Sequence, residues 1–127
     1  MESLEALPKG TVLFLKEAAE GVRLSEEIEQ YIVTLVAATR GRDELALGAS
    51  PRASLALMRL SRAAALLSHR DFVMPEDVAE LYVDAVAHRV ALSREASVSG
   101  VTAESVLADI LAATPVPFLP RTRRKLL

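Results

Sequence analysis

A serine and a proline at positions 50 and 51 open the longest helical pattern in the chain. The Ser50 hydroxyl is a good N-cap, because it can accept hydrogen bonds from the free N–H groups of a first helical turn. Pro51 suits the first helical position, where no N–H donor is needed and its fixed φ already matches a helix. We therefore predict a helix from residue 51 to about residue 68. Apolar residues cover most of its circumference, so we expect it to be buried centrally.

Arg52 is an unusual residue for the first turn of that helix. The N-terminus is the positive end of the helix macrodipole, which disfavours a cation by about 0.3–1 kcal/mol. A bound anion would reverse this preference, because free N–H groups and a forked guanidinium together suit a phosphate. The other interpretation is an ordinary capped helix start with a solvated arginine, and the local pattern alone favours neither.

The composition is that of a folded helical protein. Of 127 residues, 51% are hydrophobic and 25% are charged, which fits one globular domain. Two tyrosines and three phenylalanines are the only aromatic residues, so the core must consist mainly of aliphatic side chains. Many alanines and leucines with few glycines favour helices. We predict a mainly α fold, a small bundle of about four to five helices with two very short β segments.

Charge and residue content exclude several classes of function. A net charge of −2 provides no general attraction for nucleic acids or anionic membranes. The absence of cysteine excludes disulfides and cysteine-ligated metal centres. No apolar run approaches the ~18–20 residues of a membrane span, and the acidic N-terminus lacks a signal-peptide pattern. We predict a cytoplasmic protein that binds neither nucleic acid nor membrane.

Helical periodicity and capping residues predict four further helices, two of them opened by the N-caps Ser25 and Thr102. The predicted ranges are 8–20, 26–39, 75–89 and 103–113.

The remaining segments are predicted to be short and irregular. Residues 40–49 are predicted to form a polar loop, and prolines prevent a helix after residue 114. We therefore divide the chain into a helical domain, 1–114, and a proline-rich, basic tail, 115–127. Short extended pieces are predicted at residues 22–24, 72–73 and 90–92.

The chain lacks the sequence patterns of an independent enzyme. No glycine-rich loop is followed by Lys and Ser or Thr, which excludes a Walker A motif. His69 and His88 fall in different elements without patterned carboxylates nearby, so we expect no metal site. Ser50 has a capping role and no partner base, and Glu76 and Asp77 suit the positive start of a helix. We therefore expect no catalytic residue in this chain alone.

Five blocks of sequence follow one another in a specific order and spacing within residues 10–112. They are residues 31–33, 38–40, 48–53, 70–78 and 88–90. In that order and spacing they resemble the C-terminal lid domain of the MoxR-type AAA+ ATPases. The Gly-Ala-Ser-Pro-Arg-Ala block is specific to this family, whereas Pro-Glu-Asp-Val also starts helices in other folds. The resemblance implies a helical bundle of the AAA+ lid type.

The resemblance implies a role for Arg52. In this family the arginine of the Ser-Pro-Arg block is the sensor 2 residue, which reaches the γ-phosphate of ATP held with Mg²⁺ by the preceding large domain. Ser50 and Pro51 would form the helix start that presents Arg52. The resemblance further implies a hexameric ring with chaperone-like activity. Its lid would contact its own large domain and neighbouring subunits, and proteins with von Willebrand A domains would be partners.

The resemblance also implies what the chain lacks. The family's Walker A, Walker B, sensor 1 and arginine finger lie in the preceding domain, and none occurs here. The chain is therefore expected to be a lid fragment that neither binds ATP tightly nor hydrolyses it, whereas the full-length parent is an ATPase. Met74 departs from the family pattern, which places Thr or Ser before Pro75. We expect the lost cap to cost about 1 kcal/mol.

A second interpretation is a helical module for protein or DNA interaction. A long central helix, a short extended piece and a Pro-Glu-Asp-Val helix also resemble a histone fold. Residues 40–49, between two helices, would suit a helix-turn-helix. The net charge of −2 and the lack of a basic recognition helix argue against DNA binding.

Overall fold

The computed structural model describes residue 13 and residues 17–118. The helix predicted for residues 8–20 lies mostly outside these residues, and its described part, residue 13 and residues 17–20, is helical. Residues 115–118 are not helical, and residues 119–127 lie outside the described part. The domain boundary at residue 114 therefore stays a prediction.

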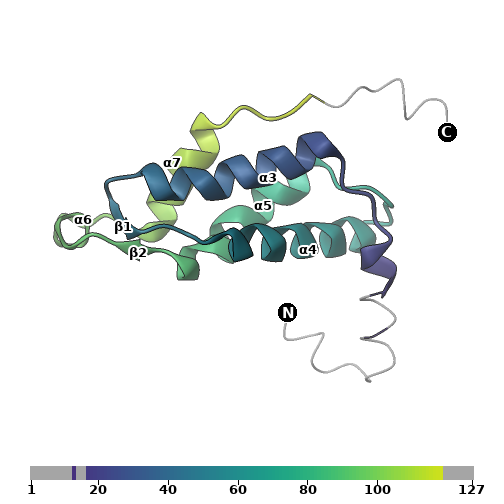
Figure 1. The fold of residues 1–127 in the computed structure, drawn as a ribbon, viewed down its shortest axis with the longest axis horizontal. Helices are drawn as coiled ribbons and strands as arrows, with labels where there is room; N and C mark the ends of the chain where they lie inside the picture. Colours follow the sequence, from purple (N-terminus) through teal and green to yellow (C-terminus); the bar gives the residue numbers. More distant parts are fainter. Residues whose placement is uncertain (1–12, 14–16, 119–127) are drawn as a thin grey trace.

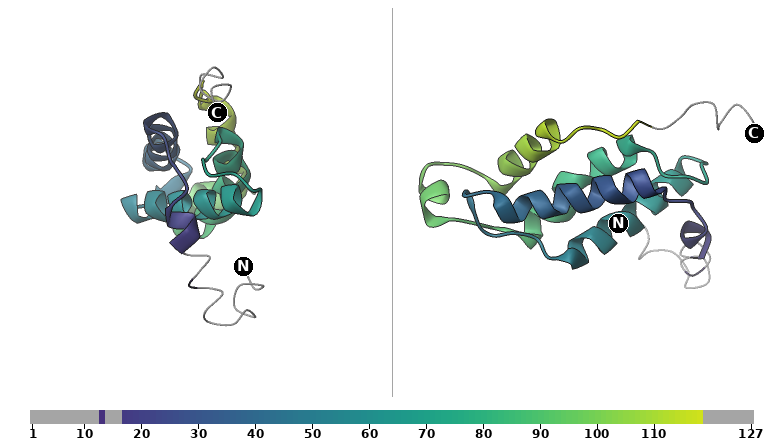
Figure 2. Two further views of the ribbon diagram at one scale, coloured as in Figure 1. Left: turned by 90° about the vertical axis from the view of Figure 1, so that its right-hand side faces the viewer. Right: turned by 45° about the horizontal axis from the view of Figure 1, so that its top comes forward.

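The described residues form a bundle built on four main helices, which confirms the mainly α prediction. Two of them, α3 and α4, run side by side in opposite directions, and Figure 2 shows this arrangement from two further sides. The next helix, α5, packs against both of them, and α7 packs against α5. The four are α3 (Glu26–Ala38), α4 (Pro51–Leu67), α5 (Pro75–Val86) and α7 (Ala103–Ala113).

Short polar side chains begin three of these helices, as predicted. The Ser25 Oγ accepts a hydrogen bond from the Ile28 N–H at 3.3 Å. The Thr102 Oγ1 accepts one from the Ser105 N–H at 3.1 Å. Each bond satisfies a first-turn donor that has no partner within its helix. The predicted starts of α3, α4 and α7 are therefore confirmed to the residue.

The core lies where α3, α4, α5 and α7 meet, and aliphatic side chains dominate it. Two tyrosines, Tyr31 and Tyr82, are also buried in it. The hydroxyl of the fully buried Tyr82 donates to the Leu35 carbonyl oxygen at 2.7 Å. Burial raises the pKa of the Tyr82 hydroxyl, so it stays a neutral donor. The largest fully buried aliphatic side chains are Ile28, Ile32, Leu35, Leu57 and Leu107.

The central burial expected for α4 is wrong. Its buried face consists of small residues and Leu57, whereas Leu55 and Leu67 are 54% and 73% exposed. Among the described helices, α3 and α5 are the ones that pack closely against α4 (Figure 1). Apolar content around a helix therefore overstated its burial, because alanine and leucine are also strong helix formers on exposed faces.

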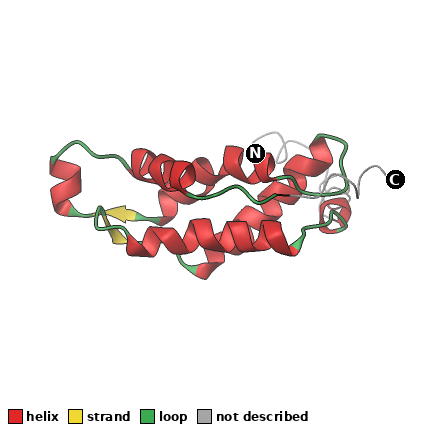
Figure 3. Cartoon of the chain, turned by 90° about the horizontal axis from the view of Figure 1, so that it is seen from above, coloured by secondary structure: helices red, strands yellow, loops and turns green. Residues whose placement is uncertain are grey.

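A small projection extends from one end of the bundle, and we call it the arm (residues 42–47 and 91–101). Its two strands are β1 (Leu45–Leu47) and β2 (Ala91–Leu92), which pair antiparallel. Beyond them lies α6 (Arg94–Val98), farthest from the bundle in Figure 3. At its base stand two 3₁₀ turns, η1 (Thr39–Gly41) and η2 (Ala87–Arg89).

The arm confirms one predicted β segment, corrects the predicted loop and contains one helix that was not predicted. The extended piece predicted at residues 90–92 contains β2. The predicted loop at 40–49 instead holds a 3₁₀ turn and β1, and α6 was not predicted at all. β1 has only three residues, too few to show an alternating pattern along the sequence. It is extended because it pairs with β2, which lies far away in the chain.

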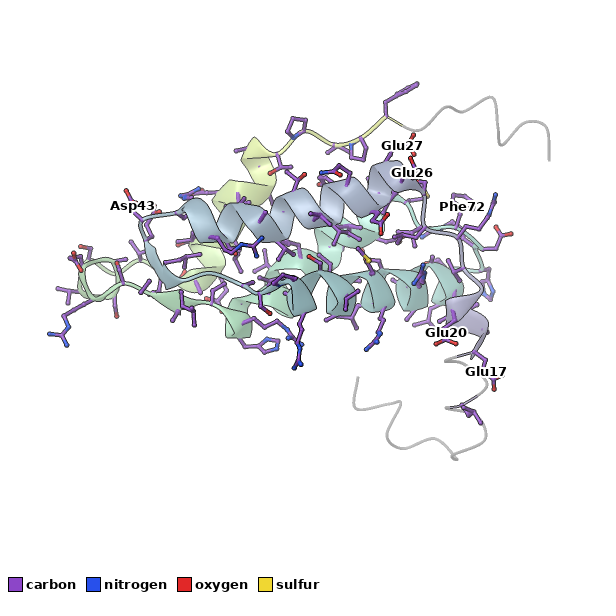
Figure 4. The ribbon with its side chains drawn as sticks, viewed as in Figure 1. Glu17, Glu20, Glu26, Glu27, Asp43 and Phe72 are labelled. Atoms are coloured by element: carbon purple, nitrogen blue, oxygen red, sulfur yellow. The ribbon has the colours of Figure 1, made fainter. Side chains whose placement is uncertain are left out.

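The segment predicted as a strand at residues 22–24 forms only a single parallel bridge, from Arg23 to Phe72. The Arg23 N–H donates to the Asp71 carbonyl at 2.8 Å, and the Val73 N–H donates to the Arg23 carbonyl at 2.9 Å. Two predicted extended pieces are thus joined to each other. Figure 4 places Phe72 at the same end of the molecule as Glu20, opposite the arm.

Candidate functional site

Arg52 lies exposed in the first turn of α4. Its N–H donates to the Ser50 Oγ at 3.3 Å, and Pro51 occupies the first helical position. The Ser50 cap and the Pro51 start are therefore confirmed as structure. The role of these three residues toward a nucleotide stays a prediction.

Two of the backbone N–H groups at this helix start already have hydrogen-bond acceptors within the turn. The N–H groups of Arg52 and Ala53 both donate to Ser50, to its hydroxyl and its carbonyl oxygen. What the turn offers to an anion is therefore mainly the Arg52 guanidinium. Among the described residues, no carboxylate lies within ion-pair distance of it. An unpaired arginine beside a helix N-terminus is a suitable partner for a phosphate oxygen.

Four residues tie the start of α4 to the end of α3, and we call them the α3–α4 joint (Thr39, Arg40, Gly48 and Ala49). The buried Thr39 hydroxyl accepts from the Ala49 N–H at 2.8 Å and donates to the Val36 carbonyl at 2.7 Å. The Arg40 Nη1 donates to the Ala49 carbonyl oxygen at 2.6 Å. Both polar groups of Ala49 are thus bonded to consecutive residues at the end of α3.

The four residues fall within two of the family blocks, but no role was predicted for Thr39, Arg40 or Gly48 from the sequence. Thr39 and Ala49 are ten residues apart, and no local capping pattern connects them. The available signal was that the Thr39-Arg40 block precedes the Gly48-Ala49 block at a spacing shared with the family. That spacing does not reveal which residues or atoms meet.

A second polar cluster holds the turn between α4 and α5. Arg70 Nη1 and Nη2 donate to the Asp77 carboxylate at 2.8 and 2.7 Å, and the Met74 N–H donates to the same carboxylate at 2.8 Å. Burial alone would raise the pKa of Asp77, but the hydrogen bonds from Arg70 and Met74 outweigh it and lower that pKa. The Arg70 guanidinium carbon also lies 5.8 Å from the centre of the Phe72 ring.

This cluster corrects the expected loss of a cap before Pro75. The Met74 side chain makes no capping bond, but the Asp77 carboxylate accepts from the Met74 backbone N–H. That bond is one half of a capping box, in which the third helical residue reaches back to the N-cap backbone. The start of α5 is therefore stabilised from inside the helix.

The two histidines do not form a metal site in the described structure. His69 and His88 are both exposed and lie in separate connections, after α4 and after α5. Among the described residues, no group of three His, Cys, Asp or Glu side chains is placed to hold a metal ion. Within the same residues, no helix is long and apolar enough to cross a membrane.

Comparison with known proteins assigns a family to this bundle. The AAA lid domain family matches residues 37–110, from the end of α3 to the last turns of α7. The chain belongs to the AAA lid domain family. This assignment decides between the lid and the helical interaction module that the sequence left as alternatives.

Relatives of this AAA lid domain are much longer proteins. Chaperone MoxR1 from Mycobacterium tuberculosis is 33% identical over 125 residues, which cover 91% of this chain and 33% of that protein. The uncharacterized protein YeaC from Bacillus subtilis is 40% identical over 118 residues, covering 92% of this chain and 37% of YeaC.

A solved structure shows the same fold. The crystal structure of a candidate ATPase from Cytophaga hutchinsonii matches with a TM-score of 0.80 and 32% identity. The match covers 87% of this chain and 36% of that chain. The AAA lid domain thus spans about a third of the length of each relative.

Replacing Ser50 by alanine removes the cap of α4 and is expected to lower the free energy of unfolding by about 1 kcal/mol. Urea unfolding of the 127-residue chain, followed by circular dichroism, measures this. Ser97→Ala is the control, because Ser97 is exposed within α6 and begins no helix. A Ser50→Ala loss no larger than the Ser97→Ala change would contradict a capping role for Ser50.

Proposed function

We propose that this AAA lid domain works in a longer MoxR-type AAA+ ATPase and that Arg52 is its sensor 2 residue. In this proposal the Arg52 guanidinium contacts the γ-phosphate of ATP bound to the large domain. The observation that supports it most is the placement of Arg52. It is exposed in a capped first turn, and no described carboxylate neutralises it.

The arginine would couple the state of the nucleotide to the position of the lid. A charge-assisted hydrogen bond of this kind contributes on the order of 1.5–3 kcal/mol. Loss of the γ-phosphate on hydrolysis would remove that contribution and favour another lid angle. A change of this size shifts a two-state equilibrium by about one to two factors of ten.

ATP and Mg²⁺ would be held mainly by the large domain, and this chain would supply one cation to the phosphate. The donor chemistry fits, because a guanidinium binds phosphate oxygens in a fixed, forked geometry. The proposed partners are the large domain of the same protein, neighbouring subunits of a hexameric ring, and proteins with von Willebrand A domains. The chaperone-like remodelling activity and the cytoplasmic location also belong to this proposal.

Replacing Arg52 by alanine in the full-length ATPase is expected to lower the rate of ATP hydrolysis about 10- to 100-fold. This range follows from losing a bond of ~1.5–3 kcal/mol at about 1.4 kcal/mol per factor of ten. Steady-state hydrolysis assays and nucleotide titrations of the purified protein measure rate and affinity. The variant must keep its secondary structure and its ring assembly, so that the loss of hydrolysis is not caused by unfolding.

The matched control is Arg59→Ala, which removes an exposed arginine from the same helix two turns later. Its hydrolysis rate should stay within about twofold of the unmodified protein, since surface changes away from a site have small effects. Equal rates for the unmodified protein and for Arg52→Ala would show that Arg52 is not the phosphate contact.

A further inference from the structure

Within the α3–α4 joint, both backbone polar groups of Ala49 are hydrogen-bonded to the end of α3. The N–H of Ala49 is bonded to Thr39 and its carbonyl oxygen to Arg40, at 2.8 and 2.6 Å. Ala49 and Thr39 are fully buried, so the bond between them is largely shielded from competing water, whereas the Arg40 bond is only partly buried. The loop that leaves α3 and enters α4 is therefore closed at its base, whatever the arm between the two helices does.

Gly48 brings the two segments of the joint into close contact. A Cβ atom at this position would lie 2.7 Å from Arg40 Cγ and 2.8 Å from Arg40 Cα and N. Two of these three atoms are backbone and cannot rotate away. Only glycine lets the strand before α4 approach the end of α3 so closely. The same loop contains Gly41, where a Cβ would meet nothing within 4 Å.

Little freedom remains between the joint and Arg52. Only Ser50 and Pro51 separate Ala49 from the arginine. Pro51 has a fixed φ, and the Ser50 hydroxyl and carbonyl oxygen are bonded to the first turn of α4. A shift of Ala49 relative to α3 must therefore move the first turn of α4, and Arg52 with it.

We propose that Thr39 is a positioning residue for Arg52 and acts through its hydrogen bond to Ala49, with Gly48 allowing the approach. This inference rests on the proposed function of Arg52. Thr39 does not touch the nucleotide in this scheme. It fixes where the arginine stands on the lid, so that the guanidinium reaches the phosphate at one lid angle and misses it at others.

The experiment uses the full-length ATPase with Thr39→Val, which keeps the shape of the side chain and removes the hydroxyl. ATP hydrolysis is expected to fall on the order of tenfold, because small misplacements of a contacting group are costly. Thr39→Ser keeps the hydroxyl and should restore hydrolysis to within about threefold of the unmodified protein. Secondary structure and ring assembly are measured for each variant.

A double-mutant cycle separates positioning from general support of the fold. If Thr39 acts through Arg52, then Thr39→Val should cause no further loss in a protein that already carries Arg52→Ala. Val106→Ala is the control, because Val106 is buried in α7 and far from the joint in sequence. Its effect on hydrolysis should be the same fold-change with and without Arg52.

A second pair of variants tests the joint from its other side. Gly48→Ala should lower hydrolysis and, like Thr39→Val, should have no further effect when Arg52 is already alanine. Gly41→Ala adds the same methyl group in the same loop where space is open, and it should leave hydrolysis unchanged. This pair keeps the test decisive if Thr39→Val fails to fold.

The outcomes distinguish the two proposals. If Arg52→Ala hydrolyses ATP normally, the sensor 2 proposal fails and this inference fails with it. The positioning role alone is overturned if Arg52→Ala loses activity while Thr39→Val and Gly48→Ala retain it. It is likewise overturned if Thr39→Val and Gly48→Ala cause a further loss of hydrolysis in a protein that already carries Arg52→Ala. The positioning role is supported if Thr39→Val and Gly48→Ala each lower hydrolysis alone but cause no further loss when Arg52 is already alanine.

Discussion

Replacing Asp77 by alanine is expected to lower the free energy of unfolding by about 3 kcal/mol, the lower end of the range for breaking a buried ion pair. The change leaves the Arg70 guanidinium without its two carboxylate bonds and the Met74 N–H without its acceptor. Asp77 is only 7% exposed, whereas the Arg70 side chain keeps some access to water, which moderates the loss. Urea unfolding of the 127-residue chain at neutral pH measures it.

The neighbouring acid provides a control for Asp77→Ala. Glu76 lies in the same first turn of α5 but is exposed, so Glu76→Ala removes a similar charge near the helix dipole without breaking the cluster. It should cost no more than about 1 kcal/mol. Equal losses for the two variants would show that the helix dipole, and not the Arg70 pair, accounts for the effect of Asp77.

The same cluster predicts a pH dependence of stability. Because the folded-state pKa of Asp77 is lowered, its contribution is fully present above the ordinary aspartate value of 3.8. It is lost as the pH falls through the lowered pKa, where the carboxylate becomes protonated. Asp77→Asn should therefore unfold with a weaker dependence on pH below about 4 than the unmodified chain.

Replacing Leu57 by alanine is expected to lower the free energy of unfolding by about 2–5 kcal/mol. Leu57 is fully buried on the face of α4 that meets α3 and α5, so its removal opens a cavity in the core. The cost combines the lost burial of the methyl groups with the incomplete collapse of their surroundings. Urea unfolding of the 127-residue chain gives the value.

Leu67→Ala is the matched control, since it makes the same chemical change in the same helix where the side chain is 73% exposed. It should alter stability by no more than about 0.5 kcal/mol. The contrast also tests the corrected description of α4. A large loss for Leu67→Ala would restore the expectation that α4 is buried on most of its circumference.

Local interactions explain why much of the bundle could be predicted from the sequence. The caps at Ser25, Ser50 and Thr102 join atoms two or three residues apart, so a reading of neighbouring residues was sufficient to place them. The buried face of α3 follows a regular helical period for the same reason. Arg52 could be singled out because its conflict with the helix dipole is also local.

The features that were missed depend on contacts between distant residues. β1 is extended because Leu45 pairs with Leu92, and three residues alone carry no strand pattern. The support of the Arg52 turn was missed because Thr39 and Ala49 belong to different elements. The Arg70–Asp77 pair was missed because Asp77 already had a sufficient local explanation as a first-turn acid.

The arm offers a way to measure the lid motion proposed above. It projects from the end of the bundle opposite Glu17 and Glu20, where the described chain begins (Figure 4). For a rotation about the end near Glu17 and Glu20, displacement grows with distance from the axis, so the tip of the arm would move farther than any helix of the core. Ser99 is exposed at that tip, and the chain contains no cysteine. A single thiol placed there would carry a fluorophore that reports domain angle without competing labels in this chain.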